Sequence, residues 1–558
     1  MKKKTTILLL FALLSSQLMT FCGGCASKES NQETTSQSSL TSELGKDSDQ
    51  NTDEFISSDI SKEETDAIYE AQVNTKGMAA DVSQQSYGTY TEPSTEEYAE
   101  ITENEFISTK KNDTSTFSAD VDTASYSNIR RMINDGCSMS EIPADAVRIE
   151  EMLNYFSYNY TAPENNEPFG VSMQSTKCPW NTENNIVMIG LNTEQVDFKD
   201  APDSNLVFLL DVSGSMSDSN KLPLLTKAFS LLAKELDKKD KVSIVTYAGE
   251  DSVLLEGVPG DQTDLILSTL DSLEANGSTN GSAGIETAYK LAKENFIKGR
   301  NNRVILATDG DLNVGITDDK ELEEFISKKK DDGIFLSTLG FGMGNYKDSK
   351  LELLADKGNG NYAYIDNLTE AKKVMVQEMG ANFTTVAKDV KLQVTFNPDV
   401  IKEYRLIGYE NRVMANEDFD DDTKDAGEIG SGHSVTALYE VKMADDYFDI
   451  NALDETEHTE DDIGYDWMTL KIRYKKPDSN KSKELSYHCY STDYKAEPSD
   501  DLSFAMAVAE FGMILRDSKY KGEGSLDQVV QLAKQTDTSK DMYKSEFVKL
   551  VNTLASRN

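Results

Sequence analysis

Three oxygen-bearing side chains follow one another closely at the end of an apolar run. Residues 206–210 are continuously apolar, as expected of a strand that is buried on both faces. Asp211, Ser213 and Ser215 come directly after this run. A carboxylate and two hydroxyls are hard oxygen donors, which suit Mg²⁺ (or Ca²⁺ or Mn²⁺) better than a thiophilic metal. Because Gly214 also lets the backbone bend closely around an ion, this turn predicts a divalent-metal site.

Two further loops offer oxygen donors to the same site. Thr279 lies in the loop 276–282, just before a helical stretch, and Asp309 follows the apolar run 304–307. In an open parallel sheet, ligands bind beyond the carboxyl ends of the strands, so these loops are expected to meet. Asp309 is expected to act directly or through water. The predicted metal site consists of Asp211, Ser213, Ser215, Thr279 and Asp309.

Three other interpretations of the turn, namely helix capping, a serine hydrolase and an aspartyl phosphatase, account for fewer of these residues. Ser and Asp commonly cap helices by accepting backbone N–H bonds, but capping gives no reason for the residues of the other two loops. A serine hydrolase needs a base for its nucleophile. The three histidines, His433, His458 and His488, all lie outside the segment that carries the turn. An aspartyl phosphatase needs a second Asp two residues after the first, where this chain has Ser213, so binding is expected rather than catalysis.

The segment from residue 200 to about 385 alternates short apolar strands with amphipathic helices. Strands are expected at 206–210, 242–247, 304–307, 335–339 and 362–365. Helices are expected at 222–236, 263–273, 281–296, 320–330, 350–357 and 369–379. This alternation predicts an α/β fold with a doubly wound, mostly parallel sheet. Residues 253–255 follow the second strand after a short turn and are expected to form an antiparallel edge hairpin.

The three loops together resemble the metal-ion-dependent adhesion site of von Willebrand factor A (VWA) domains. The Asp-x-Ser-x-Ser turn, the Thr279 loop and the strand-ending Thr-Asp-Gly at 308–310 follow the order of that family, and the resemblance covers roughly residues 200–385. By the family pattern the three hydroxyls are ligands, and the two aspartates act through metal-bound water or by direct contact. The resemblance also implies an open coordination position, which an acidic side chain of a partner protein fills.

The segments on either side resemble the modules of YfbK-like bacterial lipoproteins. Residues 116–126 and 147–156 are similar to the amino-terminal module of that family, and residues 404–412 and 425–433 are similar to its carboxy-terminal module. The resemblance covers about residues 114–558 and implies architecture more than biochemistry. An α+β module is expected before the VWA domain, and a β-rich module with terminal helices is expected after it.

The composition limits the possible partners. The 558 residues carry a formal net charge of −42, with an isoelectric point near 4.4. Nucleic acids and anionic lipid head groups would be repelled by such a surface and are excluded as partners. The chain has five cysteines, and the three beyond the amino-terminal region are far apart, so a disulfide scaffold is not expected.

The first residues predict export and lipid anchoring. A basic start precedes the apolar segment 7–14, which is too short to span a bilayer, where about 20 apolar residues are needed. A cysteine just past such a segment is typical of a lipoprotein cleavage site. Cys25 follows the small residue Gly24, as the peptidase requires, and it is favoured as the lipidated residue. Cys22 follows Phe21 and is the alternative, and ordinary secretion without a lipid is a further one.

Five segments are expected along the chain. Residues 26–105 are rich in Ser, Thr, Glu, Gln and Asp and poor in apolar side chains, which is typical of disorder. The expected segments are a lipoprotein signal peptide (1–25), a disordered acidic tether (26–105), the amino-terminal module (106–199), the VWA domain (200–385) and the carboxy-terminal module (386–558).

The sequence therefore predicts a non-enzymatic protein on the extracytoplasmic face of a cell membrane, held there by its lipid anchor alone. It is expected to bind partner proteins through the divalent ion of the VWA domain. A metal-dependent hydrolase and an envelope scaffold with a purely structural ion remain as alternatives.

Overall fold

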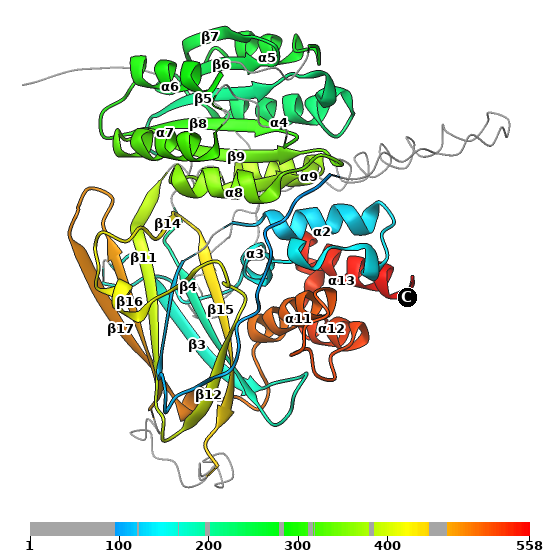
Figure 1. The fold of residues 1–558 in the computed structure, drawn as a ribbon, viewed down its shortest axis with the longest axis vertical. Coiled ribbons are helices and arrows are strands. Elements are labelled where there is room, and N and C mark those ends of the chain that lie inside the picture. Colours follow the sequence, from blue (N-terminus) through cyan, green and yellow to red (C-terminus); the bar gives the residue numbers. More distant parts are fainter. Residues whose placement is uncertain are drawn as a thin grey trace, which may run out of the picture. The chain divides into compact units, whose positions relative to one another are not determined.

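The computed structural model describes most of the chain after residue 94. The described residues are 95–119, 122–165, 167–195, 201–277, 284–310, 316, 318–378, 384–445 and 466–557. They belong to a single unit, Tyr90–Asn558, whose elements are drawn in Figure 1. No helix in this part of the chain is both long and apolar enough to cross a bilayer. The predicted signal peptide, with Cys22 and Cys25, lies outside the described residues.

A six-stranded sheet forms the centre of the α/β domain (Figure 1). Its strands in spatial order are β10 (Tyr362–Ile365), β9 (Phe335–Phe341), β8 (Asn301–Thr308), β5 (Ser204–Asp211), β6 (Lys241–Tyr247) and β7 (Asp251–Pro259). The first five strands run parallel, and the edge strand β7 is antiparallel to β6. The predicted α/β fold with a mostly parallel sheet and an antiparallel edge is confirmed.

Helices cover both faces of this sheet. They are α4 (Leu222–Glu235), α5 (Thr263–Asp271), α6 (Gly284–Glu294), α7 (Asp319–Asp331), α8 (Asp348–Lys357) and α9 (Leu368–Lys372), which continues as a π-helix (Lys373–Glu378). Apolar side chains of α4, α5 and α9 pack on one face, and those of α6, α7 and α8 pack on the other. Strand β5 is buried along its whole length because it lies in the middle of these layers, which explains its continuous apolar run.

Two antiparallel sheets are built jointly from the segments on either side of the α/β domain. The first contains β1 (Ile107–Ser108), β12 (Ile401–Ile407), β15 (Ser434–Met443), β4 (Asn185–Asn192) and β3 (Gly170–Lys177). The second contains β13 (Val413–Met414), β2 (Thr114–Ser118), β11 (Thr385–Phe396), β16 (Asp466–Lys475) and β17 (Ser482–Tyr490), and β14 (Gly427–Gly430) pairs with β11. In Figure 1 the cyan strands β3 and β4 share a sheet with the yellow strand β15. The two flanking modules therefore form one body, and the α/β domain is an insertion in it.

A cluster of helices covers the face of the first sheet that points away from the second sheet. Its members are α2 (Ala124–Asn134), α3 (Ile149–Asn154), α11 (Asp500–Leu515), α12 (Leu526–Ala533) and α13 (Met542–Ala555). On β4, Val187 and Ile189 face the second sheet, whereas Ile186 and Met188 face the helices. Helix α11 is apolar and buried on nearly all sides, as expected at the centre of a cluster. The three cysteines among the described residues are free thiols.

A buried arginine joins the helical cluster to the α/β domain. Arg130 on α2 is fully buried. Its guanidinium donates to Asp366, which precedes α9, and to Glu370 on α9, where the Nη2–Oε2 distance is 2.7 Å. Glu546 on α13 accepts from Nη1 of the same guanidinium at 3.0 Å. The charge of Arg130 thus holds together three segments that lie far apart in the sequence.

The end of the predicted tether is ordered, so the tether prediction is wrong for residues 95–105. Thr95 N donates to Gly344 O at 2.8 Å, and Glu97 N donates to Tyr346 O at 3.0 Å. Backbone hydrogen bonds of this kind hold a polar segment in place without burying an apolar core, and composition therefore does not reveal them. The rest of the predicted tether, residues 26–94, lies outside the described residues.

Replacing Arg130 by Met should strongly destabilise the protein. The change leaves the carboxylates of Asp366 and Glu370 buried without their cation, which costs about 3–5 kcal/mol. Chemical denaturation of wild type and variant measures the loss. Lys290→Met is the control, because Lys290 lies on the surface, 4.0 Å from Glu294, where an ion pair contributes about 0–1 kcal/mol. Equal denaturation midpoints for the two variants would contradict this account.

Candidate metal centre

The carboxyl ends of β5 and β8 place Asp211 and Asp309 at the same edge of the sheet. The two strands are parallel neighbours, with Leu210 of β5 opposite Ala307 of β8. Asp211 is the last residue of β5 and is fully buried. Thr308, the last residue of β8, donates from its hydroxyl to Asp211 Oδ2 at 3.0 Å. The expected convergence of these two strand ends is therefore present.

The Asp-x-Ser-x-Ser turn brings two hydroxyls close to the buried carboxylate. The backbone N–H of Ser213 donates to Asp211 Oδ1 at 2.9 Å, which fixes the side chain of Asp211. The hydroxyl of Ser213 lies 3.0 Å from that of Ser215. Ser213 is buried, and Ser215, in the short 3₁₀-helix η4 (Gly214–Ser217), is exposed. The oxygen donors of the turn therefore extend from the protein interior, at Asp211, to the protein surface, at Ser215.

The loop that carries Thr279 begins beside this turn. Asn276 N donates to Val212 O at 2.8 Å, and Gly214 N donates to Gly277 O at 3.2 Å. A Cβ atom at Gly214 would come within 3.3 Å of Gly277 O, so a glycine keeps the two loops close. Thr279 itself lies outside the described residues, and its position stays a prediction.

Asp309 is paired with a lysine that the sequence analysis did not single out. Lys221 Nζ donates to Asp309 Oδ2 at 2.9 Å, and both side chains are almost completely buried. The other carboxylate oxygen, Oδ1, is buried and has no hydrogen-bond partner among the described residues. Lys221 occupies the N-cap of α4, where the helix dipole disfavours a cation and Ser, Thr, Asp or Asn is preferred. That local conflict was the available signal in the sequence.

Burial dominates the electrostatics of Asp211. Its pKa is raised to about 6, mainly because burial disfavours the charged form and in part because Asp309 is nearby. The hydrogen bonds from Ser213 and Thr308 counteract this increase in pKa. Ionised Asp211 is therefore held at a cost that a nearby cation would offset.

The donor set fits a hard divalent cation. Two carboxylates and two hydroxyls converge, and one carboxylate oxygen of Asp309 is buried without a hydrogen bond among the described residues. Such oxygen-only sets suit Mg²⁺, Ca²⁺ or Mn²⁺. No group of three or more His, Cys, Asp or Glu side chains in the described part of the chain, this edge of the sheet included, has the geometry to hold a metal, so the hydroxyls would have to complete the set of ligands.

A loop after β9 packs against Gly310, the residue that follows Asp309. Gly310 has a φ of +106°, and a Cβ atom there would come within 2.6 Å of Lys347 N and 2.8 Å of Asn345 O. This loop is in turn paired with residues 95–97, as Glu96 Oε1 accepts from Gly344 N at 2.8 Å. The ordered segment before the folded body therefore contributes to the position of Asp309.

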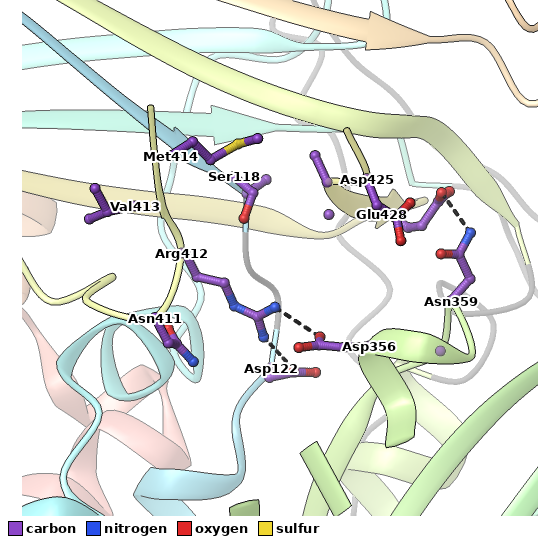
Figure 2. Close-up of a pocket in the computed structure, with 14 residues that line it drawn as sticks. Ser118, Asp122, Asp356, Asn359, Asn411, Arg412, Val413, Met414, Asp425 and Glu428 are labelled. Carbon is purple, nitrogen blue, oxygen red and sulfur yellow. Dashed lines mark hydrogen bonds and ion pairs between the residues drawn. The ribbon is translucent and has the colours of Figure 1, made fainter. Parts of the chain in front are cut away.

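A cavity of about 270 Å³ lies between α8 and the β-sheets, and Figure 2 shows its lining. Arg412 bridges Asp356 and Asp122 there, at 2.8 and 3.2 Å. Asn359 Nδ2 donates to Glu428 Oε1 at 2.8 Å, and burial raises the pKa of Glu428 to about 8. These polar groups pair with one another, and they join the α/β domain to the β-rich body.

Comparisons with known families define the class of protein. The family model of the von Willebrand factor type A domain matches residues 205–377, and a model described as von Willebrand factor matches residues 92–188. The model described as Uncharacterized protein YfbK, C-terminal, matches residues 381–556. The α/β domain is therefore a VWA domain, a class that generally mediates protein interactions and often carries a metal site.

A relative of nearly full length narrows the assignment. Protein YfbK of Escherichia coli (strain K12) is 40% identical over 470 residues, which cover 82% of this chain and 81% of that one. The chain belongs to the YfbK family of VWA-domain proteins.

More distant similarities cover parts of the chain. The magnesium-chelatase 67 kDa subunit of Chlorobaculum parvum is 25% identical over 185 residues, 30% of each chain. The solved structure of a von Willebrand factor type A protein from Catenulispora acidiphila aligns with a TM-score of 0.39 and 13% identity, over 69% of this chain and 89% of that one. The fold assignment rests on the family match and on the topology of the sheet.

Replacing Asp211 by Asn should stabilise the metal-free protein at pH 7.5. Because the pKa of Asp211 is raised in the folded state, its ionisation opposes folding above about pH 6, and this cost disappears below about pH 4. The expected gain is on the order of 1–3 kcal/mol at pH 7.5 and should shrink towards pH 4.5. Thermal unfolding in the presence of chelator measures it, with Asp264→Asn on the surface of α5 as control. A variant less stable than wild type at pH 7.5 would contradict the raised pKa.

Proposed function

We propose that this protein binds partner proteins through a divalent ion held at the carboxyl edge of its VWA sheet. The observation that carries the proposal is the convergence of Asp211, Ser213, Ser215 and Asp309, together with the buried Asp309 Oδ1 that has no hydrogen bond among the described residues. A cation would supply the missing partner of that oxygen and would offset the cost of burying two carboxylates.

The proposed ion is Mg²⁺, with Ca²⁺ or Mn²⁺ as substitutes. Ser213 and Ser215 would provide hydroxyl ligands, and Thr279 would provide a third from the neighbouring loop. Asp211 and Asp309 would contribute their charges, directly or through bound water. A bound ion would offer a positive charge at the surface, where the exposed Ser215 lies, and could accept one acidic side chain of a partner.

The proposed partner is a protein that presents an acidic side chain within a basic surrounding. This chain carries a net charge of −42, which repels acidic surfaces. At physiological salt, however, interactions are largely screened beyond about 8 Å, so the local charge of the ion dominates at contact. A basic surrounding on the partner would turn the remaining repulsion into attraction and would speed association.

We also propose that the protein acts outside the cytoplasm, anchored to a cell membrane through a lipid on Cys25, or on Cys22. The support is the sequence of the first 25 residues, and both cysteines lie outside the described residues. Residues 26–94 would then connect the anchor to the folded part of the chain.

Binding without turnover fits the positions of the described histidines. His488 lies on β17 beside Asp466, and His433 lies in the turn before β15. Both belong to the β-rich body rather than to the carboxyl edge of the VWA sheet, so neither is placed to act as a base for Ser213 or Ser215. His458 lies outside the described residues.

Calorimetry tests whether the proposed site binds a divalent ion. Wild type should bind Mg²⁺, Mn²⁺ or Ca²⁺ at one site, and Asp211→Ala should bind at least about tenfold more weakly because a carboxylate beside the ion is lost. Asp264→Ala, which removes an exposed carboxylate of the same domain, is the matched control. Identical ion uptake by wild type and Asp211→Ala would refute the site.

Affinity capture from native envelopes tests the binding function. A partner should be retained in Mg²⁺, released by chelator and not retained by Asp211→Ala. Conversion of a captured molecule to a product that depends on Asp211 would indicate a hydrolase instead. A lower melting temperature in chelator, with the same proteins retained, would indicate a structural ion.

A further inference from the structure

We propose that Lys221 is a built-in counter-ion of the metal site. Its positive charge lowers the affinity of the site for the divalent ion. The same charge leaves the ion-loaded site positive overall, and the loaded site is thereby selective for an acidic group. The proposal rests on the metal-dependent binding function and concerns how that site is tuned. Lys221 is not one of the predicted ligands, and nothing in the Asp-x-Ser-x-Ser pattern requires a lysine there.

The side chain of Lys221 is held in place along its length. Its Nζ lies 2.9 Å from Asp309 Oδ2, and its exposed fraction is only 7%. A Cβ atom at Gly342 would come within 2.5 Å of both Cγ and Cε of Lys221, so the aliphatic stem packs directly on the backbone of Gly342. The ammonium group is therefore a fixed charge beside Asp309, and it does not move freely in solvent as a surface lysine does.

The position of Lys221 is costly in other respects. It stands at the N-cap of α4, where the helix dipole opposes a cation and where no side-chain cap hydrogen bond is made. A short polar residue would suit this position better for helix stability. The ion pair with Asp309 is the interaction that offsets this cost, which points to the charge of the site as the reason for the lysine.

The net charge of the site, with and without Lys221, shows what this lysine does to ion binding. Asp211 and Asp309 contribute two negative charges when ionised, and Lys221 contributes one positive charge, so the metal-free site carries −1. A divalent ion changes this value to +1. Without Lys221 the same site would change from −2 to 0. Lys221 therefore opposes the entry of the ion through like-charge repulsion, and it leaves an excess positive charge for an incoming carboxylate.

The test compares Lys221→Met and Lys221→Arg with wild type, with Lys290→Met on the surface of α6 as control. Mn²⁺ affinity is measured by calorimetry. Water-proton relaxation of the bound Mn²⁺ then reports how readily acetate replaces its water. Lys221→Met should bind Mn²⁺ on the order of tenfold more tightly, and should need on the order of tenfold more acetate. Lys221→Arg, which keeps the charge, and Lys290→Met should stay close to wild type.

Thermal unfolding in chelator tests the counter-ion role without any metal. In chelator, Lys221→Met should have a lower melting temperature than wild type, because Asp309 loses its cation. Added Mn²⁺ should then raise the melting temperature of Lys221→Met by more than it raises that of wild type. Weaker or unchanged Mn²⁺ binding by Lys221→Met, or unchanged acetate sensitivity, would overturn the inference while leaving the proposed function intact. Absence of Mn²⁺ binding by wild type would overturn the proposed function and the inference with it.

Discussion

Two carboxylates buried at one edge of a parallel sheet are the constraint around which the VWA domain is arranged. Burying Asp211 and Asp309 is costly unless hydrogen bonds and a cation compensate. Ser213 and Thr308 donate to the first, Lys221 donates to the second, and one oxygen of Asp309 is left without a hydrogen bond among the described residues. The cost of this charge is the physical reason to expect a divalent ion there.

Buried charges are also compensated by partners of opposite charge where the VWA domain meets the body into which it is inserted. Arg130 pairs with residues at α9, and Arg148 pairs with Glu352 on α8 at 2.8 Å. Arg412 extends the second group to Asp356 at the end of α8. Removing one member of such a buried group leaves its partner's charge unpaired, so the contacts favour one arrangement of domain and body.

The sequence was sufficient for the VWA fold and for the strand ends that carry the site, because continuous apolar runs such as 206–210 and 304–307 mark strands buried on both faces. It could not show that β2 pairs with β11, or β4 with β15, because pairing over such distances leaves no local pattern. It also missed Lys221, whose role depends on a residue 88 positions away. The composition of residues 95–105 wrongly predicted disorder, because this segment is held by backbone hydrogen bonds at Thr95 and Glu97 and by hydrogen bonds that involve the side chains of Asp145 and Asn104.

Anomalous X-ray scattering from crystals grown with Mn²⁺ tests most directly whether the carboxyl edge of the VWA sheet holds a divalent ion, as proposed. A single strong peak is expected beside the hydroxyls of Ser213 and Ser215, at about 2.0–2.6 Å from its oxygen ligands. A peak in the cavity beside Asp356 and Glu428 with none at Ser213, or no peak at all, would contradict the account.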